Sequence, residues 1–462
     1  MRIVPPPPSE SLEALFLDPG GFARVRPLLD HPLVRRINRH YKPWRAVAPM
    51  ARAEGLEPLD VWGAVKFQRF SGRRRLPLVR SEGGSFTFTE TPVTREQLHR
   101  IDQTLGGGGP AAFESQRGLV SDPALRLRFA IRSMMEEAIE SSRIEGAVTT
   151  RSDALDLLRS GREPTSKYER MVVNNYAAMQ GMKKWLGSDL TIERLHSLQR
   201  IVTRDTLDDP SQAGRFRHPD EPVRIVDDRT GEVVFTPPPA VGLEGRVQRV
   251  CDFANDHHTG DEFIHPIVKA CILHFMIGYE HPYCDGNGRT ARAIFYWYAL
   301  RSGYRVFEYM AISELIRKSW SKYAMAYLNS EIDDGDLTYF IAYQLRIISR
   351  AIDRLGKHLE REESRIRRSL SLAAADPDIN LRQRLLLDHA IRHPNTVYTV
   401  KSHSSSNRVS PGTARSDLEG LVRRELLNSF KGGRTVSYVL APSAHDRLAK
   451  MESAAGAEGD RR

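Results

Sequence analysis

The chain has 462 residues, 68 Lys and Arg, 58 Asp and Glu and a formal net charge of +10, which indicates two or three domains and a moderate preference for anionic partners. Its three cysteines are an odd number without a Cys-x-x-Cys pair, and this argues against a disulfide framework. Neither an apolar run of about 18 residues nor the apolar segment of a signal peptide is present, so we predict no membrane span and expect a cytoplasmic protein.

The first region, residues 1–105, mixes helical and extended patterns. Phe alternating with Ser and Thr in Ser85–Thr91 predicts a hairpin. We interpret the run Arg73–Arg75 as a solvated turn, and contact with nucleic acid or phosphate is the alternative. The run Gly106–Gly109 breaks regular structure and marks the predicted end of this region.

The pattern then becomes almost entirely helical. Apolar residues at helical spacing predict a helix over Leu125–Arg143. Gly146 provides a stop after it, because glycine readily adopts the left-handed conformation that ends helices. Ser141 and Glu145 are one turn apart and share a face of this helix. Further helices are predicted over residues 151–160, 167–186, 192–203, 243–256, 266–280, 289–301, 312–330 and 337–355.

The interval Gly214–Pro239 interrupts the helical pattern. Two β-rich runs flank Asp227–Gly231, which is a strong hairpin signal. The first of these runs consists of Val223, Arg224, Ile225 and Val226. An extended peptide can add to a free edge of such a hairpin through main-chain hydrogen bonds.

The segment His281–Arg292 reads His-Pro-Tyr-Cys-Asp-Gly-Asn-Gly-Arg-Thr-Ala-Arg and carries the clearest chemical information in the chain. Gly286 and Gly288 leave backbone N–H groups free of side-chain obstruction, as a phosphate cradle requires. The turn leads into the N-terminus of a helix, which favours anions. Arg289 and Arg292 lie on one face of that helix, where guanidinium groups suit phosphate oxygens.

Two side chains at the mouth of this turn supply the reactive groups. Asp285 is a carboxylate that suits a Mg²⁺ ion shared with phosphates. His281 can accept a proton from an incoming hydroxyl near neutral pH. These are the groups needed to hold a nucleoside triphosphate and to activate a hydroxyl beside it. The alternative is a basic, glycine-rich connection between two helices that binds nothing.

The segment resembles the signature of the Fic (Fido) family, His-Pro-Phe-x-Asp/Glu-Gly-Asn-Gly-Arg-x-x-Arg, and departs from it only at Tyr283. The run Ser141–Gly146 resembles the family's inhibitory motif, Ser/Thr-x-x-x-Glu-Gly/Asn. The resemblance implies a mainly α fold with a helical Fic core over residues 106–370. This core would include an inhibitory helix at about 125–146 and a flap at about 214–239.

Fic proteins mostly transfer AMP from ATP to a protein hydroxyl, so the resemblance implies an adenylyltransferase that uses ATP as co-substrate and Mg²⁺ as cofactor. It implies that His281 is the catalytic base and that Asp285 holds Mg²⁺. In the family the inhibitory Glu, here Glu145, pairs with the second signature arginine, here Arg292, and prevents productive ATP binding. The residues implied to bind the nucleotide are Gly286, Asn287, Gly288, Arg289 and Arg292.

The resemblance also implies how the target reaches the base. The hairpin at Val223–Phe235 matches the family's flap, which would place a target hydroxyl beside His281. The adenine pocket is expected near the later helix that contains Tyr323 and Tyr327. Because family members often dimerise, a homodimer is a further expectation.

A second module is predicted over residues 378–445, where three helices and a hairpin resemble a winged helix-turn-helix. Its third helix has Ser410 as N-cap and Pro411 at the first helical position. Residues 380–440 contain ten Lys and Arg against four Asp and Glu, an excess that favours DNA as the partner. Protein docking is the alternative, and residues 446–462 are expected to form a disordered tail. The candidates for DNA contact are Arg408, Arg415 and Arg434.

We therefore predict an autoinhibited protein adenylyltransferase whose target is an unknown protein or the chain itself. One alternative is a DNA-binding transcriptional regulator whose Fic core only senses nucleotide. The presence of both His281 and Asp285 argues against it, since a sensor needs neither a base nor a metal ligand placed for transfer. The other alternative is a Fic enzyme that removes AMP or transfers a different nucleotide or phosphate group, because the same cradle holds several phosphate-bearing donors.

Overall fold

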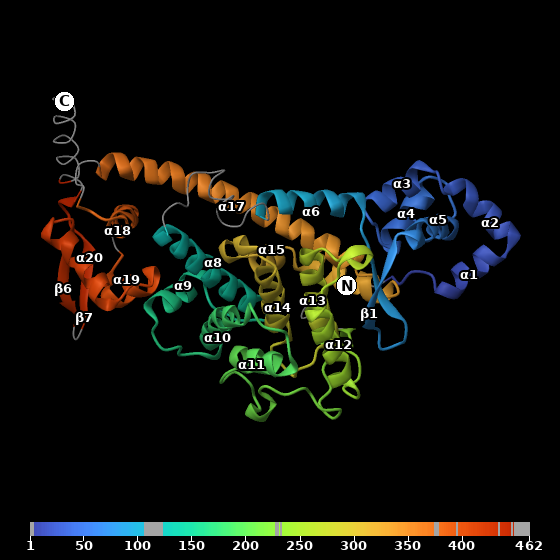
Figure 1. Ribbon diagram of the computed structural model, residues 1–462, viewed down its shortest axis with the longest axis horizontal. Coiled ribbons are helices and arrows are strands. Elements are labelled where there is room, and N and C mark those ends of the chain that lie inside the picture. The colour runs from blue at the N-terminus through green and yellow to red at the C-terminus, as the bar shows by residue number, and fades with distance from the viewer. Residues whose placement is uncertain are drawn as a thin grey trace.

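The computed structural model describes residues 4–105, 123–226, 231, 233–373, 378–393, 396–432, 435–444 and 447. In these ranges the protein is mainly helical, as predicted, with small antiparallel sheets. An N-terminal module, a central helical core and a C-terminal module follow one another along the long axis of the molecule (Figure 1). None of the described helices has the length and apolar character needed to cross a bilayer. The glycine run predicted as a boundary, residues 106–109, lies outside the described residues.

The N-terminal module encloses a small hydrophobic core of its own around Trp62. Buried polar contacts join it to the central core: Lys66 Nζ lies 2.6 Å from Asp333 Oδ1, and an Arg69 guanidinium N–H donates to the Tyr339 hydroxyl over 2.8 Å. The module is thus fixed to the rest of the protein by charged groups as well as by packing. Its helices are α1 (Ser9–Leu17), α2 (Pro19–Val25), α3 (Pro32–Arg39), α4 (Trp44–Ala53) and α5 (Pro58–Ser71).

The strands β1 (Arg73–Val79) and β2 (Ser85–Thr89) form an antiparallel hairpin, which confirms the predicted extended segment. The prediction of a solvated turn for Arg73–Arg75 is wrong, because the triplet is the first half of β1. Leu76 and Leu78 of the same strand are buried, and this period-two burial selects the strand conformation. Arg75 is exposed, and the Arg74 guanidinium donates to the carbonyl of Phe263 over 2.5 Å, so the charged ends of these long side chains find partners outside the strand.

The central core is built around α13 and α14, which are buried along almost their whole length. Its hydrophobic cluster also contains Leu76, Phe86 and Ile101, so the packing does not change at the predicted domain boundary after residue 105. The helices of the core are α6 (Pro92–Leu105), α8 (Pro123–Ile144), α9 (Arg151–Ser160), α10 (Lys167–Met182), α11 (Ile192–Val202), α12 (Leu243–Asn255), α13 (Pro266–Glu280), α14 (Asn287–Arg301), α15 (Ser313–Lys318), α16 (Trp320–Ile332) and α17 (Thr338–Ala373).

Two helices differ from their predicted extents. The helix predicted over residues 312–330 is divided into α15 and α16 at Ser319, which has the non-helical angles φ −128° and ψ 35°. The Ser319 hydroxyl donates to the carbonyl of Leu315 over 2.7 Å, a local bond that competes with a continuous helix. Helix α17 continues well past residue 355 through a charged stretch, because Arg and Glu are good helix formers.

The predicted flap is present in the described residues as a short hairpin. Strand β3 (Ile225–Val226) pairs antiparallel with β4 (Val233–Phe235). Residues 227–230 and 232 lie outside the described residues.

The C-terminal module contains three helices and a hairpin in the predicted order, together with a two-residue strand that was not predicted. Ser410 accepts a hydrogen bond from the backbone N–H of Thr413, and Pro411 is the first helical residue. The α19 helix contacts α8 and α9 (Figure 1), and Lys401 Nζ donates to the carbonyl of Gly161 over 2.8 Å. The elements are α18 (Leu381–Arg392), β5 (Tyr398–Thr399), α19 (Val400–Asn407), α20 (Pro411–Arg423), β6 (Leu427–Gly432) and β7 (Thr435–Leu440), with sheet order β5-β7-β6.

Candidate active site

The residue predicted to be the base, His281, caps the C-terminus of α13 in the left-handed conformation (φ 45°, ψ 58°). Its Nδ1 lies 3.2 Å from the carbonyl oxygen of Gly278. A carbonyl oxygen can only accept, so Nδ1 carries the proton and Nε2 keeps a lone pair. Burial lowers the pKa of His281 from its usual value of 6.5. The imidazole is therefore neutral at pH 7 and can accept a proton.

The turn between α13 and α14, residues 281–286, is closed by the side chain of Asn287. The Tyr283 N–H donates to Asn287 Oδ1 over 2.9 Å, and Asn287 Nδ2 donates to the Tyr283 carbonyl over 2.7 Å. The amide side chain is thus occupied within the turn, and what Asn287 can offer to a nucleotide is its main-chain N–H. The Tyr283 hydroxyl lies 3.3 Å from His196 Nδ1, a polar contact that the phenylalanine usual in the family could not make.

The start of α14 is the place predicted for an anion cradle. Gly286 has φ 84° and ψ 5°, and a Cβ atom there would lie 2.8 Å from Thr203 Cγ2, so the position requires glycine. The Gly286 N–H is occupied by Asp285 Oδ1 at 2.5 Å. The helix begins at Asn287, and the first N–H groups of a helix have no partner within it. The Thr290 N–H already donates to the Gly286 carbonyl, so the N–H groups of Asn287, Gly288 and Arg289 are the donors available to an anion.

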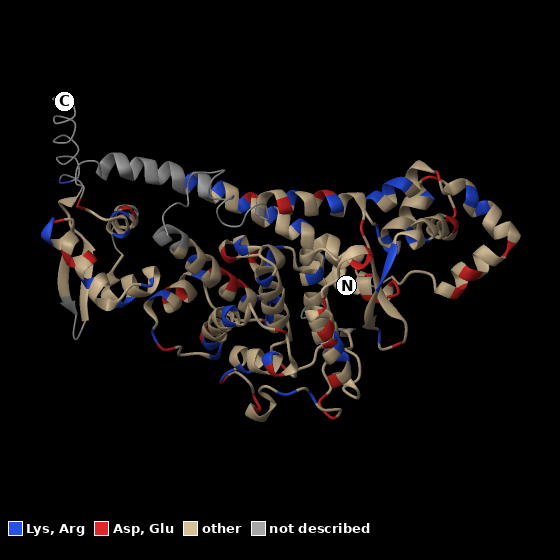
Figure 2. Cartoon of the chain, viewed as in Figure 1, with Lys and Arg blue, Asp and Glu red and all other residues tan. Residues whose placement is uncertain are grey.

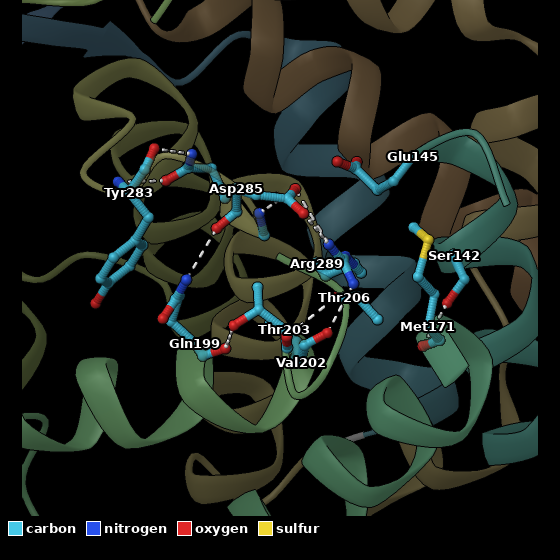
Figure 3. A network of polar contacts seen from close by, with 12 residues as sticks. Ser142, Glu145, Met171, Gln199, Val202, Thr203, Thr206, Tyr283, Asp285 and Arg289 are labelled. Carbon is cyan, nitrogen blue, oxygen red and sulfur yellow. Dashed lines mark hydrogen bonds and ion pairs between the residues drawn. The ribbon is translucent and has the colours of Figure 1, made fainter. Parts of the chain in front are cut away.

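Ser141, Glu145 and Arg292 meet, as the sequence predicted. Arg292 is 2% exposed, and its Nε donates to Ser141 Oγ over 2.8 Å. A terminal N–H of the same guanidinium donates to the Ser141 carbonyl over 3.0 Å and to Glu145 Oε1 over 2.9 Å. Figure 3 shows the Glu145 carboxylate reaching from the end of α8 toward Asp285 and Arg289.

The Glu145 carboxylate lies directly against the anion cradle. A Cβ atom added to Gly288 would overlap Glu145 Oε1 and would lie 2.9 Å from its carboxyl carbon. A carboxylate therefore occupies the space beside the first turn of α14, where free N–H groups and the helix dipole favour an anion.

Helix α8, which ends at Ile144 directly before Glu145, is anchored by buried polar groups. Glu137 accepts hydrogen bonds from the Tyr296 hydroxyl and from the Ser313 N–H, both over 2.9 Å. Burial raises the pKa of Glu137 despite these donors. The Ser142 hydroxyl donates to the carbonyl of Met171 over 3.2 Å. Because α8 is fixed in this way, Glu145 is held over the cradle by the core itself.

Arg289 is fully buried, and its guanidinium is turned toward Asp285 and α11. It donates to the Val202 carbonyl over 2.7 Å and to both carboxylate oxygens of Asp285 over 3.2 Å (Figure 3). Its Nε has no hydrogen-bond partner within the described part of the chain. Arg289 therefore orients Asp285 in this conformation, while Arg292 is the arginine that faces the cradle.

The Asp285 carboxylate suits a metal ion that is shared with phosphates. The Asp285 side chain is 45% exposed at the mouth of the cradle. Among the described residues there is no group of three or more His, Cys, Asp or Glu placed to hold a metal ion. Mg²⁺ bound with a nucleotide commonly takes one or two protein carboxylates and completes its shell with phosphates and water. The donor set therefore suits a magnesium nucleotide and does not suit a metal held by protein ligands alone.

The flap residues alternate in exposure. Val223 and Ile225 are half-buried, whereas Arg224 and Val226 are exposed. The ring of Phe235, on the second strand, packs against that of Tyr279 at 5.7 Å between centroids. The hairpin is thus seated on the core and keeps apolar residues accessible.

The rings named for the adenine pocket lie in the packed interior. The Tyr323 hydroxyl is 3.0 Å from His274 Nε2, and the Tyr327 hydroxyl donates to the His274 carbonyl over 3.2 Å. Tyr327 also stacks on Phe275 at 4.9 Å between centroids. These contacts hold both tyrosines in the core, and the adenine pocket remains a prediction without assigned residues.

The candidates for DNA contact lie far along the chain from the active site, in the C-terminal module. Arg408 ends α19 in the left-handed conformation (φ 48°) and is exposed, and Arg415 is exposed on α20. Arg434 lies outside the described residues. A groove of about 830 Å³ runs along α19, α20 and β7, and Arg415 lines it.

Comparisons with known proteins place a recognised domain on this site. Residues 189–299 match the model of the Fic/DOC family, a segment that includes the flap, α12, α13 and most of α14. A crystal structure of a Fic family protein from Desulfovibrio desulfuricans is similar over 77% of this chain and 97% of that chain, with 18% sequence identity and a TM-score of 0.47.

Curated relatives match at modest identity. Protein adenylyltransferase Fic of Nematostella vectensis is 27% identical over 271 residues, which are 56% of this chain and 56% of that protein. Protein adenylyltransferase fic-1 of Caenorhabditis elegans is 29% identical over 187 residues, 38% of this chain and 34% of that protein. The chain thus spans about a third to about half of these relatives. Together with the family match, they support a Fic-family domain within this chain.

Proposed function

We propose that the protein is a protein adenylyltransferase held inactive by Glu145. The observation that carries the proposal is the position of the Glu145 carboxylate, which pairs with Arg292 at 2.9 Å and lies against Gly288 at the start of α14. A carboxylate in an anion site competes directly with a phosphate, because two negative groups cannot share one cradle. Relatives named protein adenylyltransferase add support for this reaction class.

In the proposed reaction, His281 Nε2 accepts the proton of a Ser, Thr or Tyr hydroxyl on the target. The hydroxyl oxygen forms a bond to the α-phosphorus of ATP, the bond from that phosphorus to the bridging oxygen breaks, and pyrophosphate leaves. The N–H groups at the start of α14 and the Arg292 guanidinium oppose the negative charge of the phosphates. Asp285 would hold Mg²⁺, which reduces the repulsion between the phosphates and the incoming oxygen.

The flap supports a protein as the acceptor. Strand β3 pairs with β4 along one edge, and each strand of this two-stranded sheet has a second edge. An extended target segment could bind such an edge through main-chain hydrogen bonds and present its hydroxyl to His281.

The proposal is tested with ATP labelled at the α-phosphate. Wild type, Glu145→Gly, and Glu145→Gly combined with His281→Ala are each incubated with Mg²⁺ and the labelled nucleotide. Label on protein in the second form, far above the other two, is expected. No label in any form, with nucleotide still bound, would favour a nucleotide-sensing regulator or a donor other than ATP.

The rate of labelling by the Glu145→Gly protein should depend on pH through His281. The base acts only when it is unprotonated, and burial lowers its pKa below 6.5. We therefore expect a rate that is nearly constant between about pH 7 and 8 and falls only as the pH drops below that pKa. Initial rates across this range measure it. A rate that keeps rising above pH 8 would assign the limiting proton to another group.

DNA binding by the C-terminal module is a second candidate function, favoured by the exposed positions of Arg408 and Arg415 around the turn between α19 and α20. Figure 2 shows basic positions spread over this module together with a few acidic ones. Part of the positive charge of this module is not available to DNA, because Arg382 pairs with Asp417 and Lys401 binds the Gly161 carbonyl at the end of α9.

Arg415→Ala in the full chain is expected to weaken binding to duplex DNA several-fold and to reduce the salt dependence by about one counterion. Fluorescence anisotropy with a labelled duplex at several salt concentrations measures both quantities. Arg52→Ala, which removes an exposed arginine from the N-terminal module, is the matched control. Absence of duplex binding by the wild type at low salt would favour protein docking instead.

A further inference from the structure

Arg217 joins the 281–286 turn to the segment that leaves the flap. It is 7% exposed, and its Nε donates to the His281 carbonyl over 2.9 Å. A terminal N–H of the guanidinium donates to the carbonyl of Pro238, and the same nitrogen lies 3.5 Å from the carbonyl of Glu280. The main-chain N–H of Arg217 donates to the Pro282 carbonyl over 2.9 Å. One residue therefore holds the end of α13 and the chain just after β4.

Arg246, on α12, fastens the same two segments from another side. Its Nε donates over 2.8 Å to Oε2 of Glu280, the residue directly before His281. Its terminal N–H groups donate to the carbonyls of Pro239 and Val241 over 2.5 and 2.9 Å. Arg217, in the loop before the flap, and Arg246, on α12, thus both connect the chain that follows β4 to the C-terminus of α13.

The main-chain conformation of His281 requires such support. A histidine at φ 45° is in the left-handed region, which costs free energy for residues other than glycine and persists only where the surroundings enforce it. Arg217 binds the carbonyl of His281 with its side chain and the carbonyl of Pro282 with its main chain. These bonds fix the two peptide planes that follow the strained residue, and the 3.5 Å contact with the Glu280 carbonyl lies on the plane before it.

The contacts of the Arg217 guanidinium indicate that it positions the main chain. The partners of the Arg217 guanidinium are main-chain carbonyls on two segments, and no described carboxylate forms an ion pair with it. Arginine presents a planar fork of five donors that can reach several acceptors at once, which the single ammonium of lysine cannot do. The cost of burying this charge is offset only if the carbonyls stay where they are.

We propose that Arg217 is a positioning residue that fixes His281 relative to the flap, so that docking of a target segment and alignment of the base are coupled. The inference deepens the proposed function and rests on it. A displacement of the flap by a bound segment is transmitted through Pro238 and Arg217 to the carbonyl of His281. The nucleotide cradle on α14 is outside this connection.

The test compares Arg217→Gln and Arg217→Lys in the Glu145→Gly protein, with Arg215→Gln as the matched control. Arg215 lies two residues earlier and pairs with Glu221 over 2.7 Å. Arg217→Gln is expected to lower kcat for labelling about 10- to 100-fold, as small misplacements of a catalytic group do. ATP affinity, measured by calorimetry, should stay within about twofold because the cradle is untouched. The kcat of Arg217→Lys should lie between those of the Glu145→Gly parent and Arg217→Gln. The kcat of Arg215→Gln should equal that of the parent.

The pH profile separates alignment from general support of the fold. Burial is the main cause of the lowered pKa of His281, and the charge of Arg217 lowers it further. Removal of that charge should therefore move the acid limb of the rate profile to higher pH, whereas Arg215→Gln should not move it. An unchanged kcat and an unchanged acid limb in Arg217→Gln would overturn the proposal. Equal losses in Arg217→Gln and Arg215→Gln would overturn it as well.

Amide hydrogen exchange tests the same connection without any reaction. In Arg217→Gln, exchange should become faster in peptides that cover residues 277–284 and 239–243 and should stay unchanged in residues 287–301. If Glu145→Gly shows no labelling, the proposed function fails, and this exchange pattern still decides the role of Arg217. Unchanged exchange in both peptides would overturn the proposal.

Discussion

Replacing His281 by alanine in the Glu145→Gly protein is expected to lower the rate of AMP incorporation by about 10²- to 10⁴-fold, the usual contribution of a positioned general base. The structure gives the physical reason. The carbonyl of Gly278 holds Nδ1 in its protonated form, so Nε2 is the nitrogen that can accept a proton. Initial rates with ATP labelled at the α-phosphate measure the loss.

The control for this prediction is His257→Ala, which removes an exposed histidine from the loop after α12. It should leave the rate unchanged. ATP affinity should also be retained in His281→Ala, because the donors of the cradle belong to α14. Labelling that survives His281→Ala at the parent rate would show that another group, or water, takes the proton.

Glu145→Gly alone is expected to raise labelling by about 10- to 100-fold over wild type. A hydrogen bond to a charged group contributes about 1.5–3 kcal/mol, and each 1.4 kcal/mol is about tenfold in an equilibrium. Removing the carboxylate frees a terminal N–H of Arg292 and the space beside Gly288 for the phosphates. Glu145→Gln, which retains the volume without the charge, should give an intermediate rate.

Stability supplies an independent check on the same substitution. Arg292 is 2% exposed, and Glu145→Gly removes its carboxylate partner. The melting temperature should fall without nucleotide, because a buried charge has lost its counter-charge. Magnesium ATP should raise it more in the variant than in wild type, since ligands that bind the native state stabilise it. Equal nucleotide responses in the two proteins would contradict the assignment of Glu145.

The 281–292 segment could be predicted from sequence because its chemistry is local. Glycines, a carboxylate, a histidine and arginines at fixed spacing define a cradle at a helix start, and the structure brings them there together with Glu145. The use of the Asn287 side chain could not be predicted, since its amide and its main-chain N–H were both available for a ligand. Only the geometry of the turn shows that the amide binds Tyr283.

The role of Arg217 could not be predicted from the sequence for a different reason. Its guanidinium binds main-chain carbonyls 21 and 64 residues away, and every residue has a carbonyl. The fold showed a similar limit at Arg73–Arg75, where a run of like charges suggested a turn. These arginines are in a strand because the segment pairs with β2 and buries Leu76 and Leu78. That pairing depends on residues outside the arginine run.

The contacts between the N-terminal module and the loop before α17 determine how the protein can be divided. Asp333 and Asp336 are buried, and their partners include Lys66 and Tyr41 of the N-terminal module, at 2.6 and 2.5 Å. A chain that began after residue 72 would lose these bonds and would expose to water the surface that the N-terminal module covers. We therefore expect the family-matched segment and the N-terminal module to unfold as one cooperative unit, so that the smallest stable form of the protein is larger than the segment that the family model matches.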